Sequence, residues 1–305
     1  MDTIRLSLGP VQFLWDGPEW RDFYYRIADE TNIQRVTLGE IVCSKRFHYT
    51  APYLEDAIAR LEGSGKEVRL ASLALVTLPR EIEATRTLIE RATLPIEAGD
   101  LSALARLAGR RHSVGPLVNV YNAETARTLA ARGADIICLP PELPFSSVST
   151  VVGAVPEVAF EVFAFGKVPL AISARCAHAR SKGNTKDNCH FVCIEDPDGL
   201  AVDTLDEQPF LALNGVQTMS HTCQSLLGQT DELAAAGVRW LRLSPQHCDM
   251  VAVARLFQAV IDRRLSPQDA QEQMRLVYPA TYSNSFHFGR EGVAWVESQR
   301  ESAHV

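Results

Sequence analysis

Three cysteines in a short polar stretch are the residues of this chain whose types and spacing point most clearly to chemistry. Cys176, Cys189 and Cys193 follow a C-x12-C-x3-C spacing, and lysines and arginines lie between and beside them. Thiolates gathered in an irregular, polar segment are typical of sites that bind zinc or an iron–sulfur cluster. The spacing lacks the paired C-x2-C units of common zinc sites, which favours a cluster over zinc.

A fourth ligand must come from elsewhere in the chain, because three thiolates do not complete a tetrahedral site. The best candidate is Cys43, which lies in the segment LGEIVCSKR at residues 38–46. Whether Cys43 can reach the other three cysteines depends on the fold that the sequence encodes.

Short apolar runs alternate with amphipathic stretches along most of the chain, which is the pattern of parallel strands joined by helices. Eight strands are expected, at residues 4–9, 36–38, 68–73, 95–98, 115–120, 135–139, 158–164 and 238–243. After the seventh strand the alternation is interrupted by the irregular, cysteine-rich residues 167–220. It resumes with a helix that we expect at residues 222–236.

This order predicts an α/β fold, a (β/α)8 barrel of the TIM type with an irregular cysteine-rich insertion after strand seven. We expect one domain over residues 1–305, with an inserted cluster-binding segment at residues 167–220. A doubly wound open sheet would give much the same alternation. In a barrel, Cys43 beyond strand two and Cys176 after strand seven lie on the face that carries active sites. Strands seven, eight, one and two are successive neighbours there, which supports Cys43 as the fourth ligand.

Basic residues surround the proposed ligands. They are Lys45, Arg46, Arg175, Arg180, Lys182 and Lys186. Nearby cations would stabilise an anionic site of four thiolates, and they could also bind a carboxylate or phosphate substrate. The alternative is that these residues form a solvated basic loop without a specific role.

Three glutamates at or near strand ends could line the mouth of a barrel, namely Glu40, Glu97 and Glu161. The sequence alone gives none of them a chemical role. No Ser/His/Asp or Cys/His constellation occurs in the context of a known motif, so the sequence identifies no catalytic residue.

Three further cysteines lie outside the proposed set of ligands. Cys138 lies within an apolar run and is expected to fill the core. Cys223 and Cys248 each follow a histidine, His221 and His247, within two residues. These four side chains could form a second metal site, or the two thiols could simply pack against their neighbours.

Composition narrows the classes of function. The chain of 305 residues has a formal net charge of −7, which argues against a broad nucleic-acid-binding surface. No apolar run is long enough to span a membrane, and the first residues lack the basic and apolar regions of a secretion signal. Seven cysteines, an odd number, favour metal binding or packing over a disulfide framework. We therefore expect a cytoplasmic protein with no membrane span and no nucleic-acid partner.

Two segments resemble the signature of the collagenase-like peptidase family, peptidase U32. They are EVFAFG at residues 161–166 and SARC at residues 173–176. The signature has the form E-x-F-x-x-G, then a cysteine, then S-G-x-C. Here Pro169 occupies the position of the first signature cysteine, and Ala174 replaces the glycine. One usual cluster ligand is therefore missing, and Cys43 would replace it.

Further segments are similar, in the same order along the chain, to the ubiquinone-biosynthesis members of that family. They are LGEIVCSKR (38–46), SLALV (72–76), PLAISARC (169–176), KDNCHFVCI (186–194), LNGVQTMS (213–220) and LRLSPQ (241–246). The resemblance implies a 4Fe–4S cluster whose ligands are Cys43, Cys176, Cys189 and Cys193. It also implies a subunit of an enzyme that hydroxylates the ubiquinone ring precursor without O2, during anaerobic ubiquinone biosynthesis.

The same resemblance implies several partners. They are a heterodimeric paralogue of the UbiU type, a lipid carrier of the UbiT type, the polyprenylated ubiquinone precursor, and prephenate as the source of the oxygen atom. Three alternatives stay open: an RNA-hydroxylating member of the family, a peptidase member, and a structural module that holds zinc. The sequence does not indicate whether the cluster is redox-active or structural.

Overall fold

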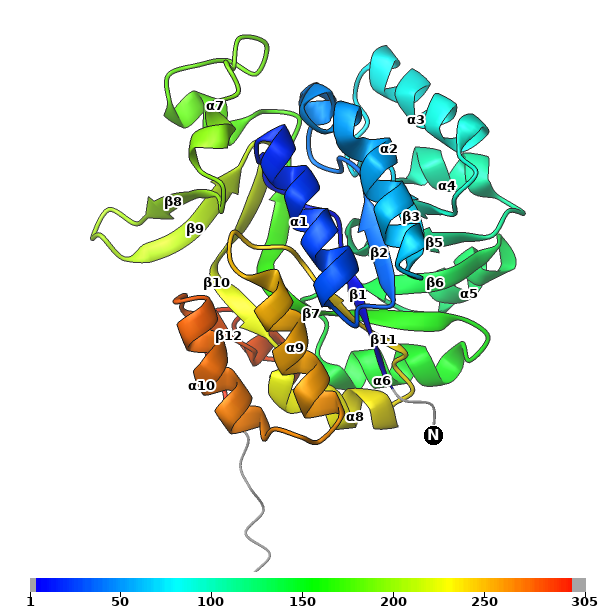
Figure 1. Ribbon diagram of the computed structural model, residues 1–305, viewed down its shortest axis with the longest axis vertical. Coiled ribbons are helices and arrows are strands. Elements are labelled where there is room, and N and C mark those ends of the chain that lie inside the picture. Colours follow the sequence, from blue (N-terminus) through cyan, green and yellow to red (C-terminus); the bar gives the residue numbers. More distant parts are fainter. Residues whose placement is uncertain (1–3, 298–305) are drawn as a thin grey trace, which may run out of the picture.

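Eight parallel strands form a closed barrel in the computed structural model, which describes residues 4–297 (Figure 1). Each strand is hydrogen-bonded to the next along the chain, and the last closes the ring by pairing with the first and the seventh. The barrel strands are β1 Arg5–Leu8, β2 Arg35–Leu38, β3 Glu67–Ala71, β4 Ile96–Ala98, β5 His112–Val114, β6 Ala134–Leu139, β7 Ala159–Ile172 and β11 Trp240–Leu243. The predicted (β/α)8 barrel is confirmed, and the open doubly wound sheet is excluded.

Helices surround the barrel (Figure 1). They are α1 Gly17–Glu30, α2 Phe47–Gly63, α3 Pro79–Arg91, α4 Leu101–Leu107, α5 Ala123–Ala131, α6 Phe145–Ala154, α8 Thr230–Ala235, α9 Met250–Ile261 and α10 Pro267–Val277. Side-chain oxygens of Asp100, Asn122 and Ser266 accept hydrogen bonds from the first turns of α4, α5 and α10, which explains where these helices begin. Within residues 4–297, no helix is long and apolar enough to cross a membrane.

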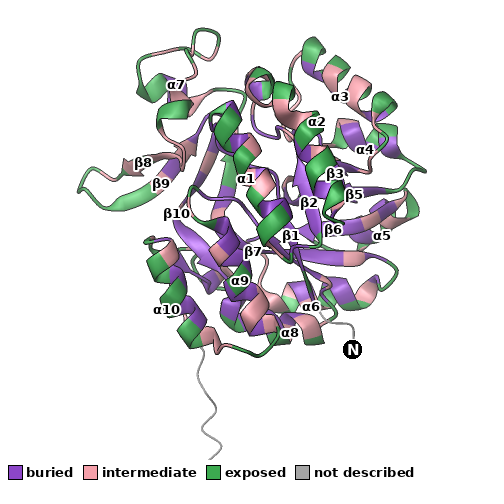
Figure 2. Cartoon of the chain, viewed as in Figure 1, coloured by how far each residue is buried: buried purple, intermediate pink, exposed green. Residues whose placement is uncertain are grey.

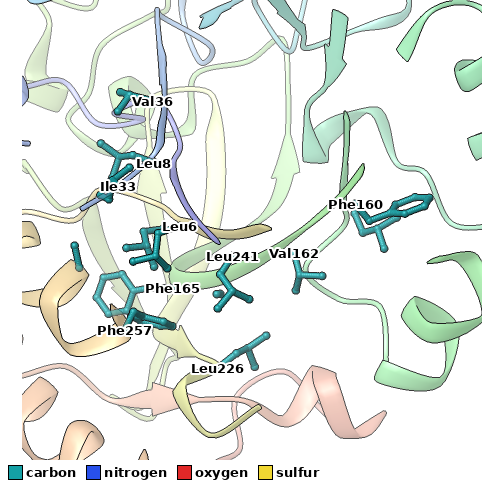
Figure 3. Close-up of a cluster of buried hydrophobic side chains, with 14 of the residues drawn as sticks. Leu6, Leu8, Ile33, Val36, Phe160, Val162, Phe165, Leu226, Leu241 and Phe257 are labelled. Carbon is teal, nitrogen blue, oxygen red and sulfur yellow. The ribbon is translucent and has the colours of Figure 1, made fainter. Parts of the chain in front are cut away.

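The main hydrophobic core lies between the barrel and its helices. Figure 3 shows Leu6 and Leu8 of β1 and Leu241 of β11 near Phe165 and Phe257, and all five side chains are fully buried. In Figure 2 the central strands are mostly buried, whereas the outer faces of the helices are exposed. Removing this apolar surface from water is the main favourable term in folding, at roughly 25 cal/mol per Å².

The seventh strand extends well beyond the barrel and carries the cysteine-rich segment. β7 is 14 residues long, and from Phe165 onward it pairs with the antiparallel strand β10 Gln217–Ser225. β9 Pro209–Asn214 and β8 Leu200–Asp203 continue this sheet on the far side of β10. Helix α7 Ala177–Ser181 and the 3-10 turn η3 Val192–Glu195 lie between β7 and β8, at the upper left of Figure 1. The predicted limits, 1–305 for the domain and 167–220 for the inserted segment, stay predictions.

Two predicted elements were wrong. Residues 222–236 do not form one helix, because Cys223 in β10 pairs with Lys167 of β7 and with Tyr282 of β12 Tyr282–Ser283. Pairing on both sides outweighs the local helical preference, so α8 begins only at Thr230. Residues 115–120 are not a strand either, because Pro116 has no N–H to contribute to a ladder and begins a 3-10 turn instead.

Charged side chains fill part of the barrel interior. Arg242 is 3% exposed and donates hydrogen bonds to both oxygens of Glu97, at 2.7 and 2.8 Å, and to Glu161 Oε2 at 2.8 Å. Burial alone would lower the pKa of Arg242, but the two carboxylates outweigh it and raise that pKa well above its ordinary value. Glu97 and Glu161, which the sequence left without a chemical role, are buried partners of an arginine.

The substitution Arg242→Met is expected to lower the free energy of unfolding by about 3–5 kcal/mol, because it removes the cation that is hydrogen-bonded to two buried carboxylates. Urea unfolding followed by circular dichroism measures this change. The control is Arg255→Met, since the Arg255 side chain is 65% exposed. That variant should change the free energy of unfolding by less than about 1 kcal/mol. Equal losses in both variants would contradict a structural role for the buried ion pairs.

Candidate metal centre

The four predicted ligands line one small cavity next to the end of β2. Cys43 reaches it from the turn after β2, Cys176 from the start of α7, Cys189 from the following loop and Cys193 from η3. All four thiols are free and partly buried. Segments far apart in the chain therefore bring their thiols to one place.

The chemistry of this donor set fits a soft metal. Within residues 4–297, no three histidine, cysteine, aspartate or glutamate side chains converge closely enough to hold a single ion. The four thiols instead surround a space, which Lys45, Arg46 and Lys186 also line. Four thiols without a carboxylate suit an iron–sulfur cluster or zinc, whereas calcium and magnesium prefer oxygen ligands.

Glu40 shapes the loop that carries Cys43. One carboxylate oxygen accepts hydrogen bonds from the backbone N–H of Val42 at 2.7 Å and of Cys43 at 2.9 Å, which closes the turn after β2. Burial raises the pKa of Glu40, although Arg46 and the two N–H groups act against that shift. Glu40 was expected to line the barrel mouth, and the structure shows that it holds the backbone of the Cys43 loop.

Arg46 is the buried cation of the site. It is 1% exposed and donates hydrogen bonds to the backbone oxygen of Gln12 and to Asn214 Oδ1, both at 2.9 Å. Burial alone would lower the pKa of Arg46, but the neighbouring Cys193 and Glu40 outweigh burial and raise it. A permanent positive charge therefore lies beside the thiols.

A buried polar network connects Arg46 to the barrel. Asn214 donates hydrogen bonds to the backbone oxygen of Gln12 at 2.8 Å and to Gln217 Oε1 at 3.1 Å. Gln217 donates to Gln12 Oε1 at 2.7 Å, and Gln12 donates to Ser244 Oγ at 3.0 Å. The loop after β1, the end of β11 and the β9–β10 turn are thus joined to the cysteine site.

His178 orders the segment that begins with Cys176. Its imidazole is buried, and Nδ1 accepts a hydrogen bond from the Gly215 N–H at 3.4 Å. The Nε2–H is then free to donate to Asp196 Oδ2, which lies 2.9 Å away. Cys176 Sγ itself accepts the N–H of Ala179 at 3.3 Å, which fixes the first turn of α7.

Burial makes the thiols of Cys43 and Cys193 harder to ionise. Burial raises the pKa of the Cys43 and Cys193 thiols, and the adjacent Arg46 acts in the opposite direction. Each thiol must therefore release a proton when it binds a metal.

Of the other predicted cations, Lys45 and Lys186 line the cavity, and Arg175, Arg180 and Lys182 lie around it. Lys45 donates to the backbone oxygen of Lys186 at 2.5 Å, and Lys182 lies 3.4 Å from a carboxylate oxygen of Glu195. An adjacent open pocket beside Cys176 is lined by Arg175 and Arg180. The basic loop is thus divided between internal contacts and an open, positively charged surface.

The remaining cysteines form no second metal site within the described residues. Cys138 is 1% exposed, as expected for a core residue. Burial raises the pKa of Cys223 and of Cys248, so neither is an activated thiolate. The imidazoles of His221 and His247 contact a backbone oxygen and a carboxylate elsewhere.

Sequence reasoning missed the residues that hold the ligand loops in place. Asn214, Gly215 and Gln217 lie in the segment LNGVQTMS, which the resemblance included without indicating a role. An Asn-Gly pair between apolar runs is a hairpin signal and could have located the β9–β10 turn. Gln12 and His178 gave no signal, because their partners lie far away in the sequence.

Comparisons with known proteins add a family match and two weaker structural likenesses. A family model described as Peptidase family U32 matches residues 21–297. The solved structure of a U32 peptidase has a TM-score of 0.45 and 14% sequence identity, and the match covers 81% of this chain and 94% of that chain. N-acetylneuraminate lyase from Fusobacterium nucleatum, complexed with pyruvate, has a TM-score of 0.46 and 8% identity, over 89% of this chain and 80% of that chain.

The substitution Gly215→Ala is expected to lower the free energy of unfolding by about 1–3 kcal/mol, because it forces a side chain into a left-handed backbone conformation. Gly215 has a φ of +63°, and an added Cβ would lie 2.6 Å from Arg46 Nη2. The matched control is Gly63→Ala at the end of α2, where an added Cβ meets nothing within 4 Å. Urea unfolding compares the two. Equal stability of the two variants would contradict a cost of the left-handed conformation at Gly215.

Proposed function

The chain belongs to peptidase family U32, and we propose that it is an iron–sulfur protein whose 4Fe–4S cluster is held by Cys43, Cys176, Cys189 and Cys193. The observation that supports this most is the convergence of these thiols on one cavity from separate segments. When bound, such a cluster would supply electron transfer or a structural cross-link.

The residues around the thiols suit that role. The Arg46 guanidinium offsets the negative charge of four thiolates, and Glu40 fixes the backbone of the Cys43 loop. Phe191 lines the cavity and packs against the rings of His48 and Tyr49, with centroids 4.9 and 5.3 Å away. These aromatic rings would limit the access of water to the site.

We further propose that the chain is a UbiV-type subunit of an O2-independent hydroxylase in anaerobic ubiquinone biosynthesis. It would act with a UbiU-type paralogue, a UbiT-type lipid carrier, the polyprenylated precursor and prephenate. The support is the ordered set of matching segments and the exchange of a signature cysteine for Pro169. Pro169 is buried in β7 opposite Met219, and Cys43 supplies a thiol to the cavity from another loop.

The alternatives make different demands on the same site. A structural zinc module would use the same thiols without sulfide. An RNA-hydroxylating member would need a surface that binds polyanions, which the net charge of −7 disfavours. A peptidase with a cysteine nucleophile would need an activated thiol, and burial has the opposite effect on Cys223 and Cys248.

Anaerobically purified protein is expected to contain about four irons and four acid-labile sulfides per chain, with a broad visible absorption band. Cys43→Ala should lose most of the iron, because three thiols do not complete the ligand set. Cys248→Ala, at a partly buried cysteine outside the cavity, should keep it. Analysis of the iron, zinc and sulfide content of each variant tests this prediction. Zinc without sulfide, or iron that is unaffected by Cys43→Ala, would refute the cluster.

The ubiquinone content of anaerobic cultures tests the proposed role in ubiquinone biosynthesis. A strain that lacks this gene should contain little ubiquinone when it grows without O2, and the wild-type chain and Cys248→Ala should restore it. Cys193→Ala should fail to restore it, because the ligand set is incomplete. Normal ubiquinone in the deletion strain would contradict the assignment. Loss of an RNA hydroxyl in that strain would favour the RNA alternative, and cleavage of gelatin by the purified chain would favour a peptidase.

A further inference from the structure

A second cavity lies between α2 and α3, next to the loop that carries Cys43. Its volume is about 510 Å³, which is within the range of small-molecule pockets. α2 packs against α1, and α3 packs against α4, so a groove runs between the two helix pairs. The carboxyl ends of β2 and β3 form its floor. We call this cavity the α2–α3 groove.

Apolar side chains dominate the lining of the α2–α3 groove. Leu54 of α2, Leu70 of β3 and Leu88 of α3 all line it, and each is only partly buried. Leu70 is notable because Leu38, its partner in the neighbouring strand β2, is 0% exposed. An apolar ligand would therefore gain free energy here by covering side chains that the fold leaves in contact with water.

Several polar groups of the groove are occupied or lie at its rim. The Glu40 carboxylate already accepts two backbone N–H groups, and Ser72 Oγ accepts the N–H of Gly99 at 2.9 Å. Arg80 and Glu83 are exposed at the edge, and the hydroxyls of Thr50, Thr85 and Thr87 complete the polar part of the lining. Apolar side chains still make up most of the lining, so recognition inside the groove depends mainly on apolar contact.

The loop of Cys43 forms one end of the α2–α3 groove. Phe47 lines the groove and immediately follows Arg46, whose guanidinium lies beside the thiols. Ser44 Oγ donates a hydrogen bond to Glu81 of α3 at 2.7 Å, so this loop also contacts the opposite helix. A ligand in the groove would end close to the cysteine site.

We infer that the α2–α3 groove binds a long, linear hydrocarbon chain of the isoprenoid or acyl kind. A protein helix is about 10 Å across and would fill 510 Å³ within little more than one turn, so it would gain little contact area. An extended hydrocarbon chain is narrower and can contact the whole lining. The catalytic role of such a ligand rests on the proposed function, whereas its binding does not.

The test is a fluorescence titration of the full chain with N-phenyl-1-naphthylamine, a neutral apolar probe, followed by displacement with alcohols of increasing chain length. Affinity should rise about fourfold per added methylene until the groove is full. Ala84→Trp, which places an indole in the groove, should weaken probe binding about tenfold or more. Ala59→Trp on the exposed surface of α2 is the matched control and should change it less than about twofold.

A second variant covers the case in which Ala84→Trp does not fold. Leu88→Gln makes the lining polar at a partly exposed position and should also weaken probe binding about tenfold. Preferential displacement by farnesol would identify an isoprenoid chain, and preferential displacement by dodecanol an acyl chain. No probe binding by the wild-type chain, or equal binding by Ala84→Trp and Ala59→Trp, would overturn the inference. Loss of a co-purifying protein in Ala84→Trp with unchanged probe binding would also overturn it, in favour of a protein contact.

Iron and sulfide measured on the same samples separate the two proposals. Probe binding by a chain that holds no iron would support ligand binding in the α2–α3 groove and contradict the proposed iron–sulfur cluster. Iron without probe binding would support the cluster and overturn the groove.

Discussion

The arrangement of the cysteines depends on one buried guanidinium, that of Arg46. A buried cation that lacks partners costs several kcal/mol, so Arg46 can hold its position only when Gln12, Asn214 and Glu40 hold theirs. The loop after β1, the loop after β2 and the β9–β10 turn must therefore form together. Hydrogen bonds that do not involve the thiols fix these loops to the barrel. They hold the backbone of Cys43 directly, and the contact of His178 with Gly215 joins the segment of Cys176 to the β9–β10 turn.

A second buried arginine, Arg242, lies in the barrel interior. Its ion pairs with Glu97 and Glu161 occupy that space, and the candidate ligands lie instead on segments that follow β2 and β7. Gly166 marks the point where β7 leaves the barrel: its φ is +123°, and an added Cβ would lie 2.8 Å from Ser244 Cβ. The first and last residues of EVFAFG thus have structural roles, one in the ion pairs and one in the exit of β7 over β11.

The barrel could be predicted from the sequence because each strand and its helix are close in the chain and differ in their apolar period. The meeting of Cys43 with the later cysteines also followed from topology, since strands seven, eight, one and two are neighbours. The supporting contacts could not be predicted, because Asn214 and Gln12 are 202 residues apart and neither lies in a pattern that indicates the other. The end of β10, from Thr222 onward, was mistaken for the start of a helix for the same reason: its pairing partners β7 and β12 are distant in sequence.

The loop between β2 and α2 is the common wall of the cysteine cavity and the α2–α3 groove. Cys43 and Arg46 face the cavity, whereas Phe47 lines the groove. Any shift at the start of α2 would move Arg46 away from its buried partners, and the cost of an unpaired buried charge opposes such a shift. A ligand in the groove would therefore be held at a nearly constant distance from the thiols. An open pocket beside Cys176 is lined by the exposed Arg175 and Arg180. The thiols thus lie between an apolar groove and an exposed basic pocket, and the loop of Cys43 and Arg46 is shared with the apolar side.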